Sequence, residues 1–136
     1  MRIKSNRITW NDASRLYDLE SKDIVVVLES NGVEVKNIST AGSLRRKRKT
    51  IGDLDIVIEV DNPCLAGKIL EDKMNYQFFS KGSFYKGGCR GNGALNIKWD
   101  IEKKQSFIKA KIQHPPLDIE KYRGIDIFSF DIHENI

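Results

Sequence analysis

Apolar side chains recur with a helical period between residues 11 and 31, which predicts a long amphipathic helix. The apolar positions on its face are Ala13, Leu16, Tyr17, Ile24, Val27 and Leu28. Thr9 or Asn11 is available as the N-cap, and Gly32 is placed to end the helix. Glu20 interrupts the apolar face. We expect this helix to pack one face against the rest of the chain.

Alternation of apolar and polar residues predicts strands in the rest of the chain. Residues 53–60 alternate cleanly, residues 33–41 alternate around Val33 and Val35, and we expect these two strands to be neighbours. After the break at Asn62 and Pro63, residues 64–74 have a short helical pattern. Further strands are predicted over residues 76–86, 94–101, 105–113 and 123–132. The order predicts an α+β domain, a mixed or antiparallel β-sheet with helices on one face.

Length and composition indicate one globular domain that spans residues 1–136. No apolar run approaches the roughly 20 residues of a membrane-spanning helix, and the polar N-terminal residues lack a signal peptide. We therefore expect no membrane partner and a cytoplasmic location, with a nuclear or viral-host setting as the alternative. Cys64 and Cys89 show no metal-ligand spacing, and free thiols are the simplest interpretation.

Charge is distributed unevenly along the chain. The net charge is +4, but residues 115–136 carry −3, which leaves +7 for the residues before them. The densest basic segment, residues 45–49, is followed at once by Asp53 and Asp55. This juxtaposition indicates a site rather than a nonspecific basic tail.

The candidate chemistry lies in Asp53-Leu54-Asp55. Residues i and i+2 of a strand project from one face about 7 Å apart along the backbone. Two neighbouring carboxylates repel each other unless a cation lies between them, and Mg²⁺ prefers such oxygen ligands. An isolated pair of this kind is more often a turn cap beside a solvated aspartate.

The preceding segment, residues 41–52, strengthens the metal interpretation. Gly42 and Ser43, at the end of a predicted strand, offer backbone N–H groups and a hydroxyl to an anion. Arg46 adds charge-assisted hydrogen bonds to phosphate oxygens. The ordered combination predicts a site where a triphosphate and metal ions meet.

These motifs resemble those of the family X DNA polymerases, a family of the nucleotidyltransferase superfamily whose catalytic domain is called the palm. The family pattern is a Gly-Ser, a bulky residue, an Arg pair, a short loop and Gly-Asp-x-Asp. Here it is met by residues 42–46 and 52–55, and Arg7-Ile8 and residues 123–127 also match family elements. The resemblance covers roughly residues 7–131 and implies a palm fold for the whole chain.

The resemblance also implies residue roles. Asp53 and Asp55 would bind two Mg²⁺ ions, with Mn²⁺ as the alternative, and Asp126 would complete the catalytic metal site. Asp100 is the rival for that third carboxylate. Ser43 and Arg46 would bind the β- and γ-phosphates of a nucleoside triphosphate, and Gly42 and Gly52 would let the backbone approach phosphates and metals.

The implied activity is transfer of a nucleoside monophosphate from an NTP or dNTP to an acceptor hydroxyl, with a DNA 3′-end favoured. We expect a single palm domain without the family's thumb, fingers or lyase domain, and a protein partner that supplies a thumb is one option. Two alternatives stay open. One is a small nucleotidyltransferase that acts on a small molecule, RNA or protein, and the other is a catalytically weak palm remnant that binds DNA or a partner.

Overall fold

The computed structural model describes residues 7–86, 88 and 91–112, the side chains of Ser43, Arg45 and Ile112 excepted. Within these residues, five strands form one sheet in the order β2-β4-β6-β7-β5. They are β2 (Val35–Ala41), β4 (Asp53–Val60), β6 (Gly93–Asp100), β7 (Gln105–Ile112) and β5 (Gln77–Phe78). Neighbours are antiparallel except β5 and β7, which are parallel. The mixed sheet and the pairing of residues 33–41 with 53–60 are as predicted.

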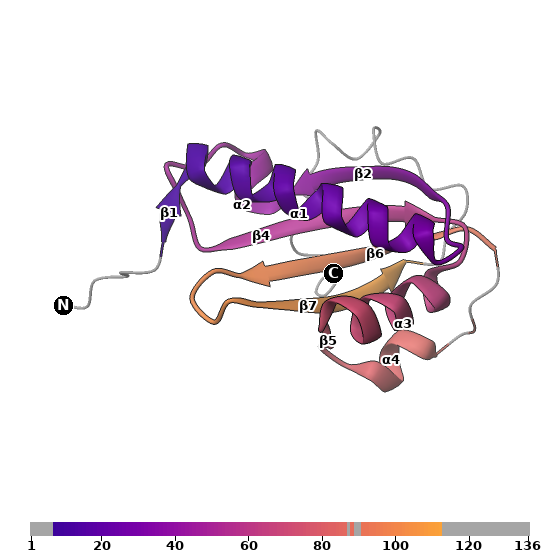
Figure 1. Ribbon diagram of the computed structural model, residues 1–136. Coiled ribbons are helices and arrows are strands. Elements are labelled where there is room, and N and C mark those ends of the chain that lie inside the picture. Colours follow the sequence, from indigo (N-terminus) through magenta and orange to yellow (C-terminus); the bar gives the residue numbers. More distant parts are fainter. Residues whose placement is uncertain (1–6, 87, 89–90, 113–136) are drawn as a thin grey trace.

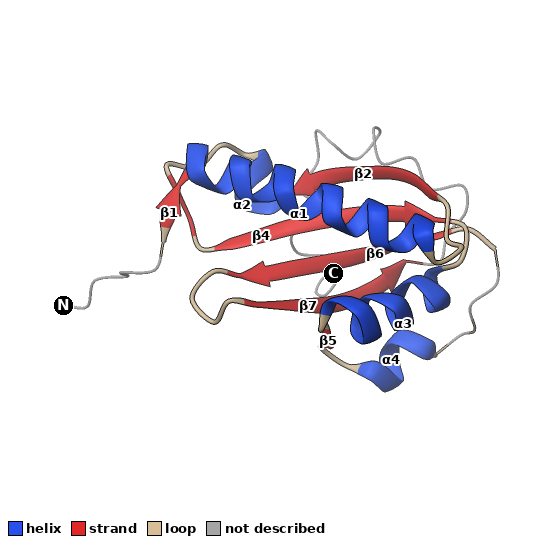
Figure 2. Ribbon diagram, viewed as in Figure 1, coloured by secondary structure: helices blue, strands red, loops and turns tan. Residues whose placement is uncertain are grey.

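Two longer helices, α1 (Trp10–Ser30) and α3 (Pro63–Met74), lie against the same face of this sheet (Figure 1). Thr9 caps α1, because its Oγ1 accepts a hydrogen bond from the N–H of Asp12 at 3.1 Å. Asn62 caps α3 in the same way through the N–H of Leu65. Figure 2 shows the resulting layer of helices over strands. The α+β class, with helices on one face, is confirmed.

The main core lies between these helices and the sheet. Ile24 and Leu28 of α1 and Leu70 of α3 are fully buried against apolar side chains of the central strands. The strand residues in this cluster are Ile56, Ile58 and Val60 from β4, Leu95 and Ile97 from β6, and Ile108 from β7. Burial of such side chains stabilises the fold by roughly 1.5–3 kcal/mol each. One face of the sheet is thus occupied by the core.

A second apolar cluster joins the start of α1 to the residues before β4. A short ribbon pairs β1 (Ile8–Thr9) with β3 (Thr50–Ile51), and the short helix α2 (Gly42–Arg45) directly follows β2. Ala13, Leu44, Ile51 and Leu54 are buried together here. The residues that carry the sequence motif are therefore fixed by their own small core.

The prediction of a strand over residues 76–86 is wrong for most of its length. Only β5 is a strand, and a short helix, α4 (Lys81–Tyr85), follows it. The helical turn carries Phe84 into the core, where its ring packs on Phe78 at 4.9 Å between centroids and faces Gly67 of α3. An extended segment would alternate its side chains between the two faces of the sheet.

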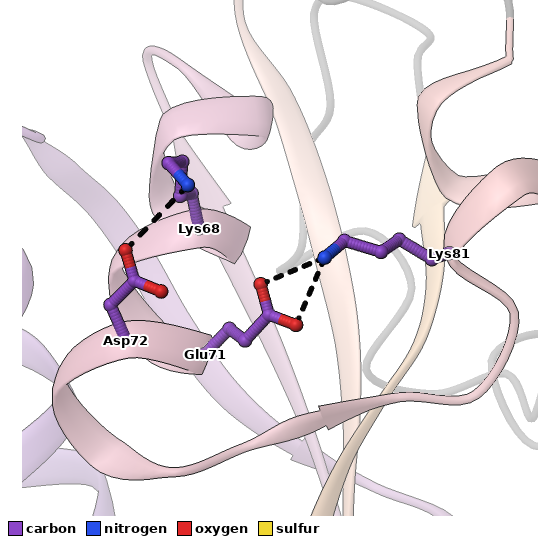
Figure 3. A network of polar contacts seen from close by, with 4 residues as sticks. All are labelled: Lys68, Glu71, Asp72 and Lys81. Carbon is purple, nitrogen blue, oxygen red and sulfur yellow. Dashed lines mark hydrogen bonds and ion pairs between the residues drawn. The ribbon is translucent and has the colours of Figure 1, made fainter.

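One ion pair on the surface links α4 to α3, and a second lies within α3 (Figure 3). Lys81 Nζ lies 3.1 Å from both carboxylate oxygens of Glu71, and Lys68 pairs with Asp72 at 3.7 Å. Exposed pairs of this kind contribute about 0–1 kcal/mol, so their effect is local. The pair of Lys81 with Glu71 adds a weak link between α4 and α3.

Three further predictions concern the cysteines, a strand near the C-terminus and membrane-spanning helices. Cys64 in α3 is disulfide-bonded, so the expectation of a free thiol is wrong for this residue, and Cys89 lies outside the described residues. The predicted strand over residues 123–132 also lies outside them. No helix in the described part of the chain is long and apolar enough to cross a membrane.

Candidate functional site

The two aspartates of the motif open strand β4. Leu54, between them, is 1% exposed and belongs to the apolar cluster beneath α1. Asp53 and Asp55 therefore lie on the opposite face of the sheet, away from the helices, and both are partly exposed. The predicted side-by-side arrangement of two carboxylates on one face is what the strand provides.

Cross-strand register gives this pair its neighbours. On β6, Lys98 lies opposite Asp55 and Asp100 lies opposite Asp53, while Ala41 of β2 lies opposite Asp55 from the other side. Directly paired residues share a face of the sheet. Lys98 Nζ lies 3.8 Å from Oδ2 of Asp53. An ammonium group thus stands beside the carboxylate pair, at a position that the sequence motif did not single out.

Asp55 has an unusual proton affinity. Its pKa is raised to about 6: burial raises it most and the charge of Asp53 raises it as well, while Lys109, Lys98 and Arg46 lower it. Near pH 6 half of the Asp55 carboxyl groups are ionised, and a cation close to them favours the ionised form. Perturbed carboxylates of this kind are typical of functional sites.

Gly42 lies against this carboxylate. A methyl group on Gly42 would lie 3.2 Å from Cγ of Asp55 and closer still to Oδ2. Its φ of +64° is also a conformation that residues with side chains adopt only with strain. The backbone that follows β2 thus approaches Asp55 so closely that a side chain at Gly42 would not fit.

Packing fixes the turn that follows Gly42. Trp10 of α1 donates an indole hydrogen bond to the carbonyl oxygen of Leu44 at 2.9 Å, and Arg46 closes α2 with its N–H on the carbonyl oxygen of Gly42. Arg46 contributes positive potential at Asp55. The side chain of Ser43 lies outside the described part of the chain, so the structure places only its backbone, at the second position of α2.

Gly52 lies against an arginine side chain. A methyl group at this position would lie 2.8 Å from Nη1 of Arg7. Arg7 holds Thr50 with two hydrogen bonds, from Nε to Oγ1 at 2.9 Å and from Nη2 to the carbonyl oxygen at 2.8 Å. The carbonyl of Gly52 accepts from the N–H of Ile101. In this structure Gly52 therefore makes room for an arginine that fixes the approach to β4.

The third carboxylate of the site was left between two residues. Asp126, the first choice, lies outside the described residues. Asp100 lies opposite Asp53, and its Oδ1 accepts a hydrogen bond from the N–H of Lys103 at 3.0 Å. Within residues 7–86, 88 and 91–112, no three acidic, histidine or cysteine side chains gather closely enough to hold a metal ion. The described site is thus a pair of carboxylates.

A pair of carboxylates is enough to bind a Mg²⁺ ion that also coordinates the phosphates of a substrate. Mg²⁺ is commonly bound by one or two carboxylates together with water and substrate phosphates, rather than by a cage of protein ligands. Asp53 and Asp55 offer this donor set on an accessible face, and the backbone beside them at Gly42 has no side chain that would block a phosphate. The residues present fit the ion.

Sequence reasoning missed Lys98 and Lys109, the two lysines that act on the aspartates. Both lie on strands distant in the chain, and only the register of β6 and β7 brings them to this face. Lys98 is two residues from Asp100, and Lys109 is two residues from Phe107. This spacing places each pair on one face of a strand, and it was the signal that the sequence offered. No protein-family model, curated protein or solved structure matches the chain.

Proposed function

We propose that the chain is a metal-dependent nucleotidyltransferase with a palm fold, similar to the catalytic palm of the family X DNA polymerases. It transfers a nucleoside monophosphate from an NTP or dNTP to an acceptor hydroxyl, with a DNA 3′-end favoured. The observation that carries the proposal is the contact between Gly42 and Asp55. The Gly-Ser segment and the aspartate pair, the two halves of the motif, meet at one point on the sheet.

The order of elements supports the same proposal. A helix leads into β2, the Gly-Ser turn follows β2, and the aspartate pair opens the antiparallel neighbour β4. The helices cover the face of the sheet opposite the aspartates, so a substrate would approach the site from the aspartate face (Figure 1).

In the proposed reaction, the acceptor hydroxyl oxygen attacks the α-phosphorus and forms a new P–O bond. The bond from the α-phosphorus to its bridging oxygen breaks, pyrophosphate leaves with that electron pair, and the hydroxyl proton passes to water. Asp53 and Asp55 would hold Mg²⁺, which when bound supplies Lewis-acid stabilisation of the phosphate charge. Arg46 and the Gly42-Ser43 backbone bind the β- and γ-phosphates. Asp126, or its rival Asp100, completes the carboxylate set.

A second candidate is a palm remnant that binds nucleic acid without transfer. The pairing of Lys98 with Asp53 favours it, because an ammonium near a carboxylate partly replaces a metal ion. In this case Mg²⁺ would add nothing to nucleotide binding. A titration of nucleotide binding with and without Mg²⁺ distinguishes the two candidates.

The test measures binding of a nucleoside triphosphate to the purified chain with and without Mg²⁺, followed by transfer of labelled nucleotide to a primed oligonucleotide. We expect Mg²⁺-dependent binding and transfer, both lost in Asp53→Asn and Asp55→Asn. Asp72→Asn is the matched control, because Asp72 lies exposed on α3 on the helical side of the sheet. The proposal is overturned if neither Mg²⁺ nor Mn²⁺ promotes nucleotide binding to the unaltered chain. Asp126→Asn and Asp100→Asn, assayed side by side, identify the third carboxylate.

A further inference from the structure

A recess of about 170 Å³ opens on the face of the sheet that carries the aspartate pair. Its lining residues are Phe79, Lys98, Asp100, Lys103, Phe107 and Lys109. Lys98 joins the recess to the site, since its ammonium also lies beside Asp53. Lys109 acts on Asp55 through its charge. The recess and the candidate site are therefore continuous.

Two phenylalanines form the apolar part of the recess. Phe79 is 71% exposed, and Phe107 is partly exposed opposite Lys98 on the neighbouring strand. Phe79 is held in position, because its N–H donates to the carbonyl oxygen of Ile108 at 2.9 Å. Two residues further along, Lys81 pairs with Glu71 of α3 (Figure 3). An aromatic ring is thus presented to solvent from a fixed backbone.

The polar part of the recess is mostly cationic. Lys98, Lys103 and Lys109 contribute three positive charges against the single carboxylate of Asp100. Lys103 Nζ also lies 6.0 Å from the ring centroid of Phe107. Aromatic faces beside ammonium groups are typical of surfaces that bind single-stranded nucleic acid, where bases stack and phosphates pair with lysine.

We propose that this recess binds the terminal nucleotide of a single-stranded nucleic acid, with its base on Phe79 and Phe107 and its phosphates on Lys98, Lys103 and Lys109. The volume suits a single aromatic ring such as that of a pyrimidine base, because a protein cavity of about 150 Å³ accommodates benzene. The inference rests on the proposed function in one respect, that the bound strand is the acceptor. Its end then lies next to the aspartates.

The test is fluorescence anisotropy of labelled oligothymidylate and oligouridylate with the full chain in EDTA, which removes any contribution from metal and triphosphate. Phe79→Ala should weaken binding about tenfold, the size of one base stacked on an aromatic ring. Leu19→Ala is the matched control, because Leu19 is 63% exposed on α1, far from the recess lining. It should leave the affinity unchanged.

Lys109→Gln should weaken binding and reduce the slope of log K against log salt by about 0.7, the effect of one lost phosphate contact on a single strand. Lys22→Gln, at an exposed position of α1, is its control. The proposal is overturned if both recess variants bind oligonucleotides as the unaltered chain does. It is also overturned if a blunt duplex binds equally well and without dependence on Phe79, since its bases are already stacked.

The two proposals fail separately. If Asp55→Asn binds oligothymidylate normally, and neither it nor the unaltered chain transfers nucleotide, the recess stands and the transferase does not. If the unaltered chain transfers nucleotide while Phe79→Ala and Lys109→Gln bind oligonucleotides and transfer normally, the transferase stands and the recess does not.

Discussion

Gly42 and Asp55 touch so closely that the backbone of one occupies the space beside the carboxylate of the other. Gly42→Ala would place a methyl group against Cγ and Oδ2 of Asp55 and force a side chain into a φ of +64°. The strain alone costs about 1–3 kcal/mol. We expect a lower midpoint of urea unfolding by this amount or more, together with loss of nucleotide transfer.

Substitutions at two other glycines distinguish the cost of backbone strain from the effect of the contact between Gly42 and Asp55. Gly32, with φ +91°, has open space around it, so Gly32→Ala should show only the cost of strain and keep its transfer activity. Gly82 in α4 has neither problem, and Gly82→Ala should be neutral or stabilising by up to about 1 kcal/mol. Equal activity in all three variants would contradict the role given to the contact of Gly42 with Asp55.

Asp55 should make the metal-free protein lose stability as pH rises. Burial raises its folded pKa to about 6 from 3.8, so its contribution is complete below pH 3.8 and is lost as pH passes 6. Asp55→Asn removes this loss. Between pH 4 and pH 7.5, the free energy of unfolding of the variant should therefore rise by up to about 2 kcal/mol relative to that of the unaltered chain.

The measurement is urea unfolding of both proteins in EDTA at several pH values. A difference between them that stays constant from pH 4 to pH 7.5 would show that the carboxyl group titrates alike in the folded and unfolded chains. Repeating the series with Mg²⁺ should stabilise the unaltered chain at pH 7.5 and leave Asp55→Asn unchanged, because only the former keeps both carboxylates.

Local patterns predicted much of the fold because local contacts decide it. Strand β4 has the predicted limits of 53 and 60, since one of its faces is apolar along the whole length, with Leu54, Ile56, Ile58 and Val60. Helix α1 begins one residue earlier than predicted, with Thr9 as its cap. Glu20, which interrupts the apolar face of this helix, accepts a hydrogen bond from the hydroxyl of Tyr76. The interruption is thus a partly buried polar contact that sequence periodicity alone could not explain.

The site was predicted only where its residues are close in sequence. Gly42, Arg46 and the aspartate pair lie within one hairpin of β2 and β4, so their spacing carried the information. Lys98 and Lys109 reach the site only through the register of β6 and β7. A shift of that register by one residue would have placed both lysines on the opposite face of the sheet. The turn at residues 81–85 was missed because the burial of Phe84 against α3 decided it.

Arg7 and Gly52 should be energetically coupled. Gly52→Ala places a methyl group 2.8 Å from Nη1 of Arg7, which can shift only by weakening its bonds to Thr50. We expect Gly52→Ala to cost about 1 kcal/mol in the unaltered chain, the value of one such hydrogen bond, and close to nothing in an Arg7→Ala background. Urea unfolding of the four proteins gives the coupling energy. Additive costs would mean that the two residues do not interact in solution.

The hydrogen bond between Tyr76 and Glu20 joins the end of α3 to the middle of α1, and it should be visible in alkaline solution. Burial raises the pKa of Tyr76 above its ordinary value of 10.0, and the nearby Glu20 charge adds to the rise. The contribution of this tyrosine is complete below pH 10 and is lost above it, because the unfolded chain ionises first. Tyr76→Phe should therefore cost about 1–2 kcal/mol at pH 7 and show a smaller decline in stability between pH 9.5 and pH 11. Glu20→Gln, which keeps an acceptor oxygen, is the matched variant and should retain the steep decline. An identical alkaline decline in Tyr76→Phe and the unaltered chain would rule out the buried contact.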